Sequence, residues 1–249
     1  MFEKIIKNPY STNPHMEKYE GPIIVQPAMD FFTEEKETEY SVLGNLIHFE
    51  SDIAIENELV KKTVKKLNLS DEYNTIVSLG LNIQEDVIIL HKGKIEAAFV
   101  AFPSGWSLED KQGKTLEEIH EPVADGELLR QMSNKLTQLL CGKYNYHRYV
   151  WTVAPVGMLS MHPAYHYNDP EFSEPPETLD DLWFRIEHQT TLSVVENETS
   201  AFFINVDVLP YNSLHDEDKN LIVESINSMT DAVLDYKHLR KIKDILNMD

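Results

Sequence analysis

The stretch DVIILHKGKIEAAFVAF, from Asp86 to Phe102, decides the fold class of this chain. Its two apolar runs, Asp86–Leu90 and Glu96–Phe102, are rich in residues that suit β-strands, and the connection His91–Lys94 contains a glycine. Such a connection is typical of a hairpin between neighbouring antiparallel strands. The stretch therefore predicts an antiparallel sheet at the centre of the fold.

The periodicity of the remaining chain predicts helices that flank this sheet. Apolar residues recur at helical spacing in four segments, which are Ile55–Leu69, Glu127–Leu140, Asp216–Ser228 and Asp231–Leu246. Further strands are expected at Tyr149–Val156 and Ala201–Val208. The two patterns together predict an α+β fold.

The chain divides into a short arm and one domain. Residues 1–21 are polar and contain Pro9 and Pro14, which favours an extended arm that lies on the domain. Residues 22–249 show no repeat and no long linker, and we expect them to form a single unit. The segment Pro163–Leu179 is rich in proline and acidic residues and is expected to be an irregular surface loop.

Composition excludes several classes of function. The 249 residues carry a formal net charge of −20, and this field repels the phosphates of nucleic acids and of anionic lipids. With Cys141 as its one cysteine, the chain forms no internal disulfide and supplies no all-cysteine metal site. No glycine-rich phosphate loop is present, which disfavours ATP and dinucleotides. Charged residues interrupt the N-terminal apolar run, so we expect neither a secretory signal nor a membrane span, and a cytoplasmic location.

Polar residues at alternate positions indicate a site in the segment Trp183–Val195. If this segment is extended, Arg185, Glu187 and Gln189 lie on the same face, because alternate residues of a strand share a side. Arg185 and Arg148 both stand within apolar runs, where an unpaired charge is costly. Their partner is either the internal carboxylate of Glu187 or the carboxylate of a substrate or cofactor, which a planar guanidinium binds through two hydrogen bonds.

A second group of candidates lies in the loop from Ser104 to Val123. His120 is held between Ile119 and a proline, and its imidazole is either a hydrogen-bonded structural group or a metal ligand. Trp106 and Lys111 share the loop. On residue type alone, Trp106 is a core-edge side chain and Lys111 is a solvated turn residue.

Two other candidate sites are less favoured by their context. His162 and His166 are four residues apart, but Pro163 lies between them and the glutamate of a helical zinc motif is missing. Cys141 has no neighbouring pattern that would activate a nucleophile, and we expect a buried, inert thiol.

A series of short motifs follows in a fixed order along the chain. The motifs are QEDVIIL with Asp86, FPSGW ending at Trp106, Lys111 with Gly113, IHEPV with His120, RYVW with Arg148 and Trp151, RIEHQTTL from Arg185 to Leu192, SAFFINVDVLPYNSL, and YKHL from Tyr236. In order and spacing, the series resembles the haem-dependent oxidative N-demethylase alpha-subunit-like family. The chain departs from the usual family pattern at Ala124, Val150 and His188.

The resemblance implies a PAS-like fold, in which an antiparallel sheet and flanking helices enclose a haem b. His120 is then the expected axial ligand of the iron, because a neutral imidazole commonly ligates haem. The other cofactor-binding residues that it implies hold the propionates or form the pocket wall, and they are Arg148, Arg185, Lys111, Trp106 and Trp151. His162, His166 and His188 are the alternative iron ligands.

The resemblance also implies an activity. It is the oxidative removal of a methyl group from a small secondary amine such as dimethylamine, with O2 and with electrons from partner flavin and iron–sulfur subunits. Glu187 and Gln189 are expected to orient the amine or a bound water. Two alternatives stay open: a haem or small-ligand sensor without turnover, and a domain without haem in which His120 and the arginines form only internal hydrogen bonds.

Overall fold

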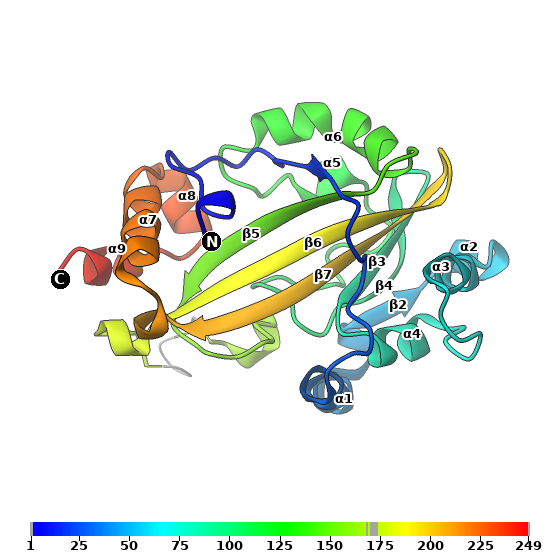
Figure 1. The fold of residues 1–249 in the computed structure, drawn as a ribbon, viewed down its shortest axis with the longest axis horizontal. Coiled ribbons are helices and arrows are strands. Elements are labelled where there is room, and N and C mark those ends of the chain that lie inside the picture. The colour runs from blue at the N-terminus through cyan, green and yellow to red at the C-terminus, as the bar shows by residue number, and fades with distance from the viewer. Residues whose placement is uncertain (1, 168, 170–173, 249) are drawn as a thin grey trace.

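An antiparallel sheet forms the centre of the protein. The computed structural model describes residues 2–167, 169 and 174–248. Within these residues, seven strands lie in the order β1-β5-β6-β7-β3-β4-β2 (Figure 1). Every neighbouring pair is antiparallel, which confirms the predicted α+β class and the sheet type. The finer description as PAS-like stays a prediction.

The strands differ greatly in length. Their bounds are β1 Glu17–Lys18, β2 His48–Glu50, β3 Asp86–His91, β4 Lys94–Phe99, β5 Tyr146–Ala154, β6 Trp183–Val195 and β7 Thr199–Pro210. Strands β5, β6 and β7 are the long ones and run side by side through the sheet (Figure 1). The predicted strands at Tyr149–Val156 and Ala201–Val208 correspond to β5 and β7.

The hairpin that sets the fold class is tighter than the sequence predicted. His91 pairs with Lys94, so the turn contains only Lys92 and Gly93. Both residues have positive φ, 50° and 82°, which is the backbone that a two-residue turn between twisted strands requires. Glycine adopts this conformation without steric cost, and its position at the second turn residue therefore explains the short connection.

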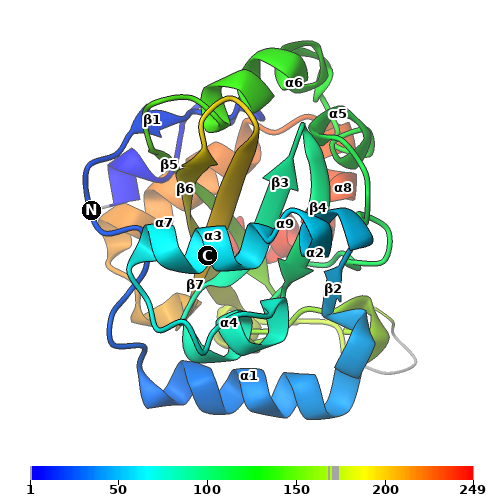
Figure 2. The ribbon, with the colours of Figure 1, turned by 90° about the vertical axis from the view of Figure 1, so that its right-hand side faces the viewer.

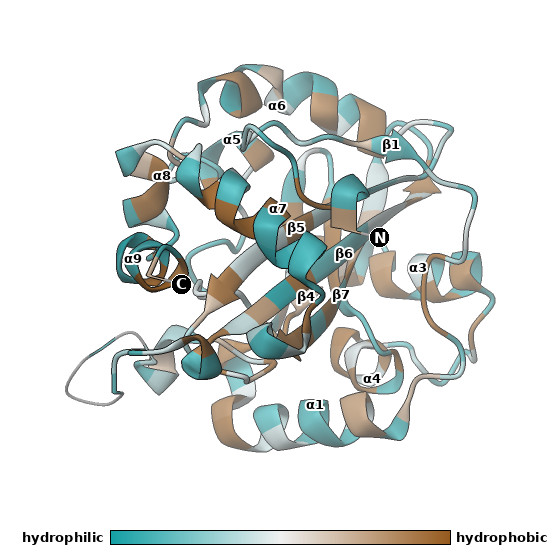
Figure 3. Cartoon of the chain, turned by 60° about the vertical axis from the view of Figure 1, so that its left-hand side comes forward, coloured by the Kyte–Doolittle hydropathy of each residue, from teal (hydrophilic) through white to brown (hydrophobic). Residues whose placement is uncertain are grey.

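Helices cover both faces of the sheet. Their bounds are α1 Asp30–Leu43, α2 Asp52–Glu56, α3 Leu59–Leu67, α4 Ile76–Asn82, α5 Leu116–Ile119, α6 Glu127–Leu140, α7 Asp216–Asn227, α8 Asp231–Tyr236 and α9 Arg240–Leu246. Helices α1, α3 and α4 pack on one face at the β2 end of the sheet (Figure 2). Helix α6 packs Leu129, Leu136 and Leu140 on the opposite face, whereas Leu128 and Met132 stay exposed, and apolar and polar residues alternate along its ribbon (Figure 3).

Helices α7 to α9 and the N-terminal arm share a second core cluster at the far end of the sheet. Phe2 and Ile6 of the arm are buried there with Phe184 of β6. Ser225 of α7 donates a hydrogen bond to the carbonyl of Lys7 at 2.7 Å. Residues 2–15 are therefore tied to the domain by apolar burial as well as by hydrogen bonds.

Two predicted helices are each divided in the structure. The segment Ile55–Leu69 breaks at Glu58, whose φ is 51°, and Ile55 is 59% exposed instead of facing the core. The segment Asp231–Leu246 breaks near His238, whose φ is 56°. A left-handed residue cannot continue a right-handed helix, and the apolar spacing carries no trace of such a break. Helices α1 and α4 were not predicted at all.

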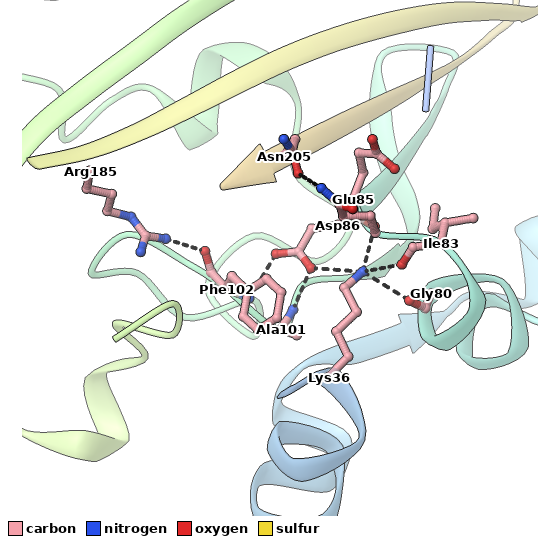
Figure 4. A network of polar contacts seen from close by, with 10 residues as sticks. Lys36, Gly80, Ile83, Glu85, Asp86, Ala101, Phe102, Arg185 and Asn205 are labelled. Carbon is pink, nitrogen blue, oxygen red and sulfur yellow. Dashed lines mark hydrogen bonds and ion pairs between the residues drawn. The ribbon is translucent and has the colours of Figure 1, made fainter. Parts of the chain in front are cut away.

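A buried ion pair ends β4 earlier than predicted. The Asp86 carboxylate accepts hydrogen bonds from the backbone N–H groups of Ala101 and Phe102, at 3.0 and 2.8 Å. These residues therefore bend towards Asp86 and leave the strand after Phe99. Lys36 of α1 lies 3.5 Å from the same carboxylate, and both side chains are fully buried (Figure 4).

Lys36 also links α1 to the segment that leads into β3. Its Nζ donates to the carbonyls of Gly80, Ile83 and Glu85, at 3.0, 3.2 and 2.6 Å (Figure 4). Burial lowers the pKa of Lys36 and raises that of Asp86, and each charge opposes the shift of the other. The pair thus satisfies backbone groups from two separate segments, residues 80–85 and 101–102, in one desolvated cluster.

We expect Lys36→Met to destabilise the protein by about 3–5 kcal/mol, because it leaves a buried carboxylate and three carbonyls without their cation. Urea unfolding measures the change. Lys61→Met is the matched control, since Lys61 forms an exposed pair with Glu58 at 2.9 Å and should change little. Equal stabilities for the two variants would contradict the importance given to the buried pair.

Candidate functional site

A cavity of about 500 Å³ lies against the face of the sheet that carries α5 and α6. Its volume is in the range of sites for small molecules and cofactors. The lining comes from the sheet, from the loop between β4 and α6, from the N-terminal arm and from the segment Tyr236–Ile242. It includes the eight residues that the sequence assigned to the cofactor or the substrate, namely Trp106, Lys111, His120, Arg148, Trp151, Arg185, Glu187 and Gln189.

The register of β5 and β6 places three polar side chains together. Arg148 pairs with Gln189, and Glu187 lies two residues earlier on the same strand. Side chains at these positions leave the sheet on one face, so all three point to the cavity side. The extended conformation that the alternating pattern required is therefore present.

A continuous chain of hydrogen bonds connects the two arginines. Arg148 Nε donates to Gln189 Oε1 at 2.5 Å, and Gln189 Nε2 donates to Glu187 Oε2 at 2.6 Å. Ser104 Oγ donates to Glu187 Oε1 and accepts from Arg185 Nε at 2.7 Å. Glu187 is thus the shared internal partner of both arginines, reached through Gln189 on one side and Ser104 on the other.

Arg185 is committed to the protein itself. Its Nη1 donates to the carbonyl of Leu159 at 2.7 Å. Its Nη2 donates to the carbonyl of Phe102, also at 2.7 Å (Figure 4). The residue is only 1% exposed. With Nε on Ser104, all three nitrogen atoms are engaged, and this geometry favours an internal role over the predicted contact with a cofactor carboxylate.

Arg148 is different, because its outer nitrogen atoms are free within the described part of the chain. Only Nε is engaged, by Gln189, while Nη1 and Nη2 have no hydrogen-bond partner among those residues. Burial lowers the pKa of the guanidinium, and the nearby carboxylate of Glu187 acts in the opposite direction. The free side of the guanidinium is suited to a carboxylate ligand.

His120 is a neutral imidazole with one committed nitrogen. It follows the short helix α5, which is capped by Thr115 and Glu118. His120 Nδ1 lies 2.6 Å from the carbonyl of Leu116, and this contact makes Nδ1 the protonated nitrogen. Burial lowers its pKa to about 4. Nε2 has no partner among residues that the structure describes, so its lone pair is available on the cavity wall.

The remaining predicted residues occupy different parts of the wall. Trp106 is partly buried and packs against the core under α6. Lys111 Nζ donates to the carbonyl of Ile119 at 3.3 Å, next to His120. Trp151 pairs with Ile186, so its ring leaves the other face of the sheet and packs on Phe184. The ring therefore belongs to the second core cluster, whereas the carbonyl of Trp151 accepts a hydrogen bond from Lys237, another residue of the lining.

The cavity is strongly cationic although the chain is acidic. Its lining holds five cationic side chains, those of Lys7, Lys111, Arg148, Arg185 and Lys237, and one carboxylate, that of Glu187, among the described residues. Ser104, Lys237 and Tyr10 were not predicted as site residues. FPSGW and YKHL contain the first two, but their roles depend on partners distant in the chain. This charge distribution favours an anionic ligand.

The alternative histidine ligands lie elsewhere. His162, His166 and His188 are not among the residues that line the cavity. His162 is buried and accepts from Ala164 N at 3.2 Å, and His188 lies 3.1 Å from Nδ1 of His147. The described part of the chain holds no cluster of three or more His, Cys, Asp or Glu side chains placed to bind a metal ion. Cys141 is buried and free, and burial raises its pKa.

Comparison with known proteins identifies the family. The sequence model of the family described as "Haem-dependent oxidative N-demethylase, alpha subunit-like" matches residues 24–247. The chain belongs to this family. No curated protein matches it. The family description names a cofactor, haem, and a reaction, oxidative N-demethylation. The residues of the cavity can be compared with the requirements of both. In the described residues, we find no helix with the length and apolar character to span a membrane.

The residues of the cavity fit a haem. His120 offers an unpaired Nε2 whose tautomer is fixed by the Leu116 carbonyl, which is the arrangement that metal-ligating histidines commonly show. Arg148 offers free donors for a carboxylate, and the apolar part of the wall includes Ile88, Phe202 and Ile204. A ligand that is apolar over most of its surface and anionic at one edge meets complementary groups here.

We expect His188 to make the protein less stable in mild acid. Burial and His147 lower the pKa of His188 to about 4. The unfolded chain therefore binds more protons between this value and about 6.5, so stability rises with pH in that window and is full above it.

Between pH 7 and pH 5, the free energy of unfolding of the native protein should fall by about 2 kcal/mol more than that of His188→Gln. Urea unfolding at both pH values measures the difference. Parallel pH curves for the two proteins would exclude a depressed pKa at His188.

Proposed function

We propose that this protein is a haem-dependent oxidative N-demethylase of a small methylated amine, with His120 as the axial ligand of a haem b. The observation that carries the proposal is the placement of an unpaired His120 Nε2 in the same cavity as the free donors of Arg148. The family match to residues 24–247 supports the class of reaction.

A bound haem supplies the oxygen activation and the redox chemistry that removal of a methyl group requires. The electrons come from outside the chain, since one cysteine cannot hold an iron–sulfur cluster, and we propose flavin and iron–sulfur subunits as the donors. In the overall reaction, the amine, O2, two electrons and two protons give the demethylated amine, formaldehyde and water. We retain the cytoplasm as its predicted location.

Glu187 is the residue that we assign to the amine. It is the one carboxylate in the described lining, and an N–H of a cationic or neutral amine donates well to a carboxylate. Gln189 and Ser104 hold its two oxygen atoms, which fixes the direction of the remaining lone pairs. Gln189 is hydrogen-bonded to both Arg148 and Glu187, so it fixes their positions relative to each other. Trp106 forms part of the cavity wall on the loop side.

The axial ligand is tested by absorption spectroscopy of the protein with added haem. We expect His120→Ala to lose the stoichiometric Soret band of the native protein, or to shift it markedly, because the iron loses its nitrogen ligand. Added imidazole should restore the native spectrum, since the deleted side chain leaves room for it at the same position.

His15→Ala and His238→Ala are the matched controls, because both histidines also line the cavity but are exposed. An unchanged spectrum in His120→Ala, or a loss in either control, would remove the assignment of His120.

The activity is tested by formaldehyde release from dimethylamine with O2 and a reductant. Glu187→Gln should lower kcat/KM by at least about tenfold, because it removes a charged hydrogen-bond acceptor for the amine. Glu196→Gln makes the same change at an exposed position outside the cavity and should have no effect. A haem-loaded native protein that releases no formaldehyde would favour the alternative, a haem-binding or ligand-binding protein without turnover.

A further inference from the structure

We propose that Lys237 and Arg148, together with the hydroxyl of Tyr10, form the carboxylate-binding end of the cavity. The inference rests on the proposed function, since it takes the carboxylates to be the two propionates of the bound haem. It replaces the sequence expectation that Arg148, Arg185 and Lys111 share this role.

The two arginines of the cavity differ in how many of their N–H donors are already engaged by the protein. Nε, Nη1 and Nη2 of Arg185 donate hydrogen bonds to Ser104, Leu159 and Phe102, respectively. In Arg148, only Nε donates a hydrogen bond within the described residues, and its acceptor is Gln189. The guanidinium nitrogen atoms that remain for a ligand are therefore those of Arg148.

Lys237, which directly follows α8, also has free N–H donors. Its Nζ donates to the carbonyl of Trp151 at 3.1 Å, and within the described chain it forms no ion pair at 4.0 Å or less. An ammonium carries three N–H donors, so two remain. Burial lowers its pKa to about 8, and the charge of Glu187 acts in the opposite direction.

The cations of Arg148 and Lys237 lie in the same part of the cavity. Lys237 Nζ donates to the carbonyl of Trp151, which lies on β5 close to Arg148 in the strand, and the charge of Glu187 acts on both cations. Tyr10 of the arm lies near both, because its ring centroid is 5.9 Å from Lys237 Nζ and the charge of Arg148 acts on the pKa of its hydroxyl. Within the described residues, the Tyr10 hydroxyl has no hydrogen-bond partner, and Tyr10 lines the cavity.

The charges at this end match a dicarboxylate. Arg148 and Lys237 each carry one positive charge and have no ion-pair partner within 4.0 Å among the described residues, so this end has an excess of two positive charges without a direct counter-ion. Two carboxylates neutralise this excess, and each gains charge-assisted hydrogen bonds from free donors. Once the cations are neutralised, Glu187 is also a better site for a cationic amine, because fewer uncompensated positive charges surround it.

Lys111 does not belong to this end. It donates to Ile119 in the loop that carries His120, and its electrostatic partners are Lys114 and Asp110. The inference therefore replaces Lys111, which was expected from the sequence, by Lys237, which was not.

The test compares ferric protoporphyrin IX with its dimethyl ester, which keeps the ring and the iron but lacks both carboxylates. Apoprotein is titrated with each porphyrin, and Kd is read from the Soret band. We expect the native protein to prefer the diacid, and Lys237→Met and Arg148→Met each to weaken diacid binding about tenfold or more. Binding of the ester should change by less than about twofold, so the preference for the diacid disappears.

Two control variants make the comparison specific. Lys241→Met removes the same charge from an exposed position on α9, and Lys111→Met removes it from the other wall of the cavity. Both should keep the native preference for the diacid. Tyr10→Phe should reduce the preference without changing ester binding, and circular dichroism verifies that each variant is folded.

The outcomes separate this inference from the proposed function. If the native protein binds neither porphyrin, the proposed function fails and this inference fails with it. If the native protein binds the diacid and the ester equally, or if Lys237→Met and Arg148→Met keep the native preference, only this inference is overturned. A loss of preference in Lys111→Met instead would assign the carboxylates to the loop side.

Discussion

The buried pair of Lys36 and Asp86 is the interaction on which the rest of the structure depends. It joins α1, the end of α4 and the start of β3, and it turns the chain out of β4 through the backbone of Ala101 and Phe102. The carbonyl of Phe102 then accepts from Arg185, and Arg185 holds Ser104 against Glu187. The position of the site carboxylate is thus linked, through Phe102 and Arg185, to the buried ion pair at the start of β3.

Local patterns explain which parts of the fold could be predicted. Helix α6 was predicted with its observed bounds, and the alternation in β6 placed Glu187 and Gln189 on one face, because both patterns depend on neighbours in the chain. The two-residue hairpin turn and the breaks at Glu58 and His238 depend on single left-handed residues, which apolar spacing does not record. Helices α1 and α4 carry their apolar residues towards a core that only the assembled sheet defines.

In the site as well, the residues could be predicted from the sequence, but their hydrogen-bond partners could not. Eight candidates chosen from sequence motifs line one cavity, yet the motifs could not distinguish Arg185, whose donors are all engaged, from Arg148, whose outer nitrogen atoms are free. That difference depends on the carbonyls of Leu159 and Phe102, which are distant in the chain from both arginines. Ser104 and Lys237 were missed for the same reason, since serine and lysine carry no signal of their partners.

The N-terminal arm has a practical consequence for anyone who defines this protein by its family boundaries. The family match begins at residue 24, whereas Phe2 and Ile6 are buried in a core and residues 10–15 form part of the cavity wall. A chain trimmed to the matched region would expose Phe184 and open the binding site to bulk water. Homology limits and the cooperative folding unit therefore do not coincide here, and comparisons of ligand affinity among relatives need full-length chains.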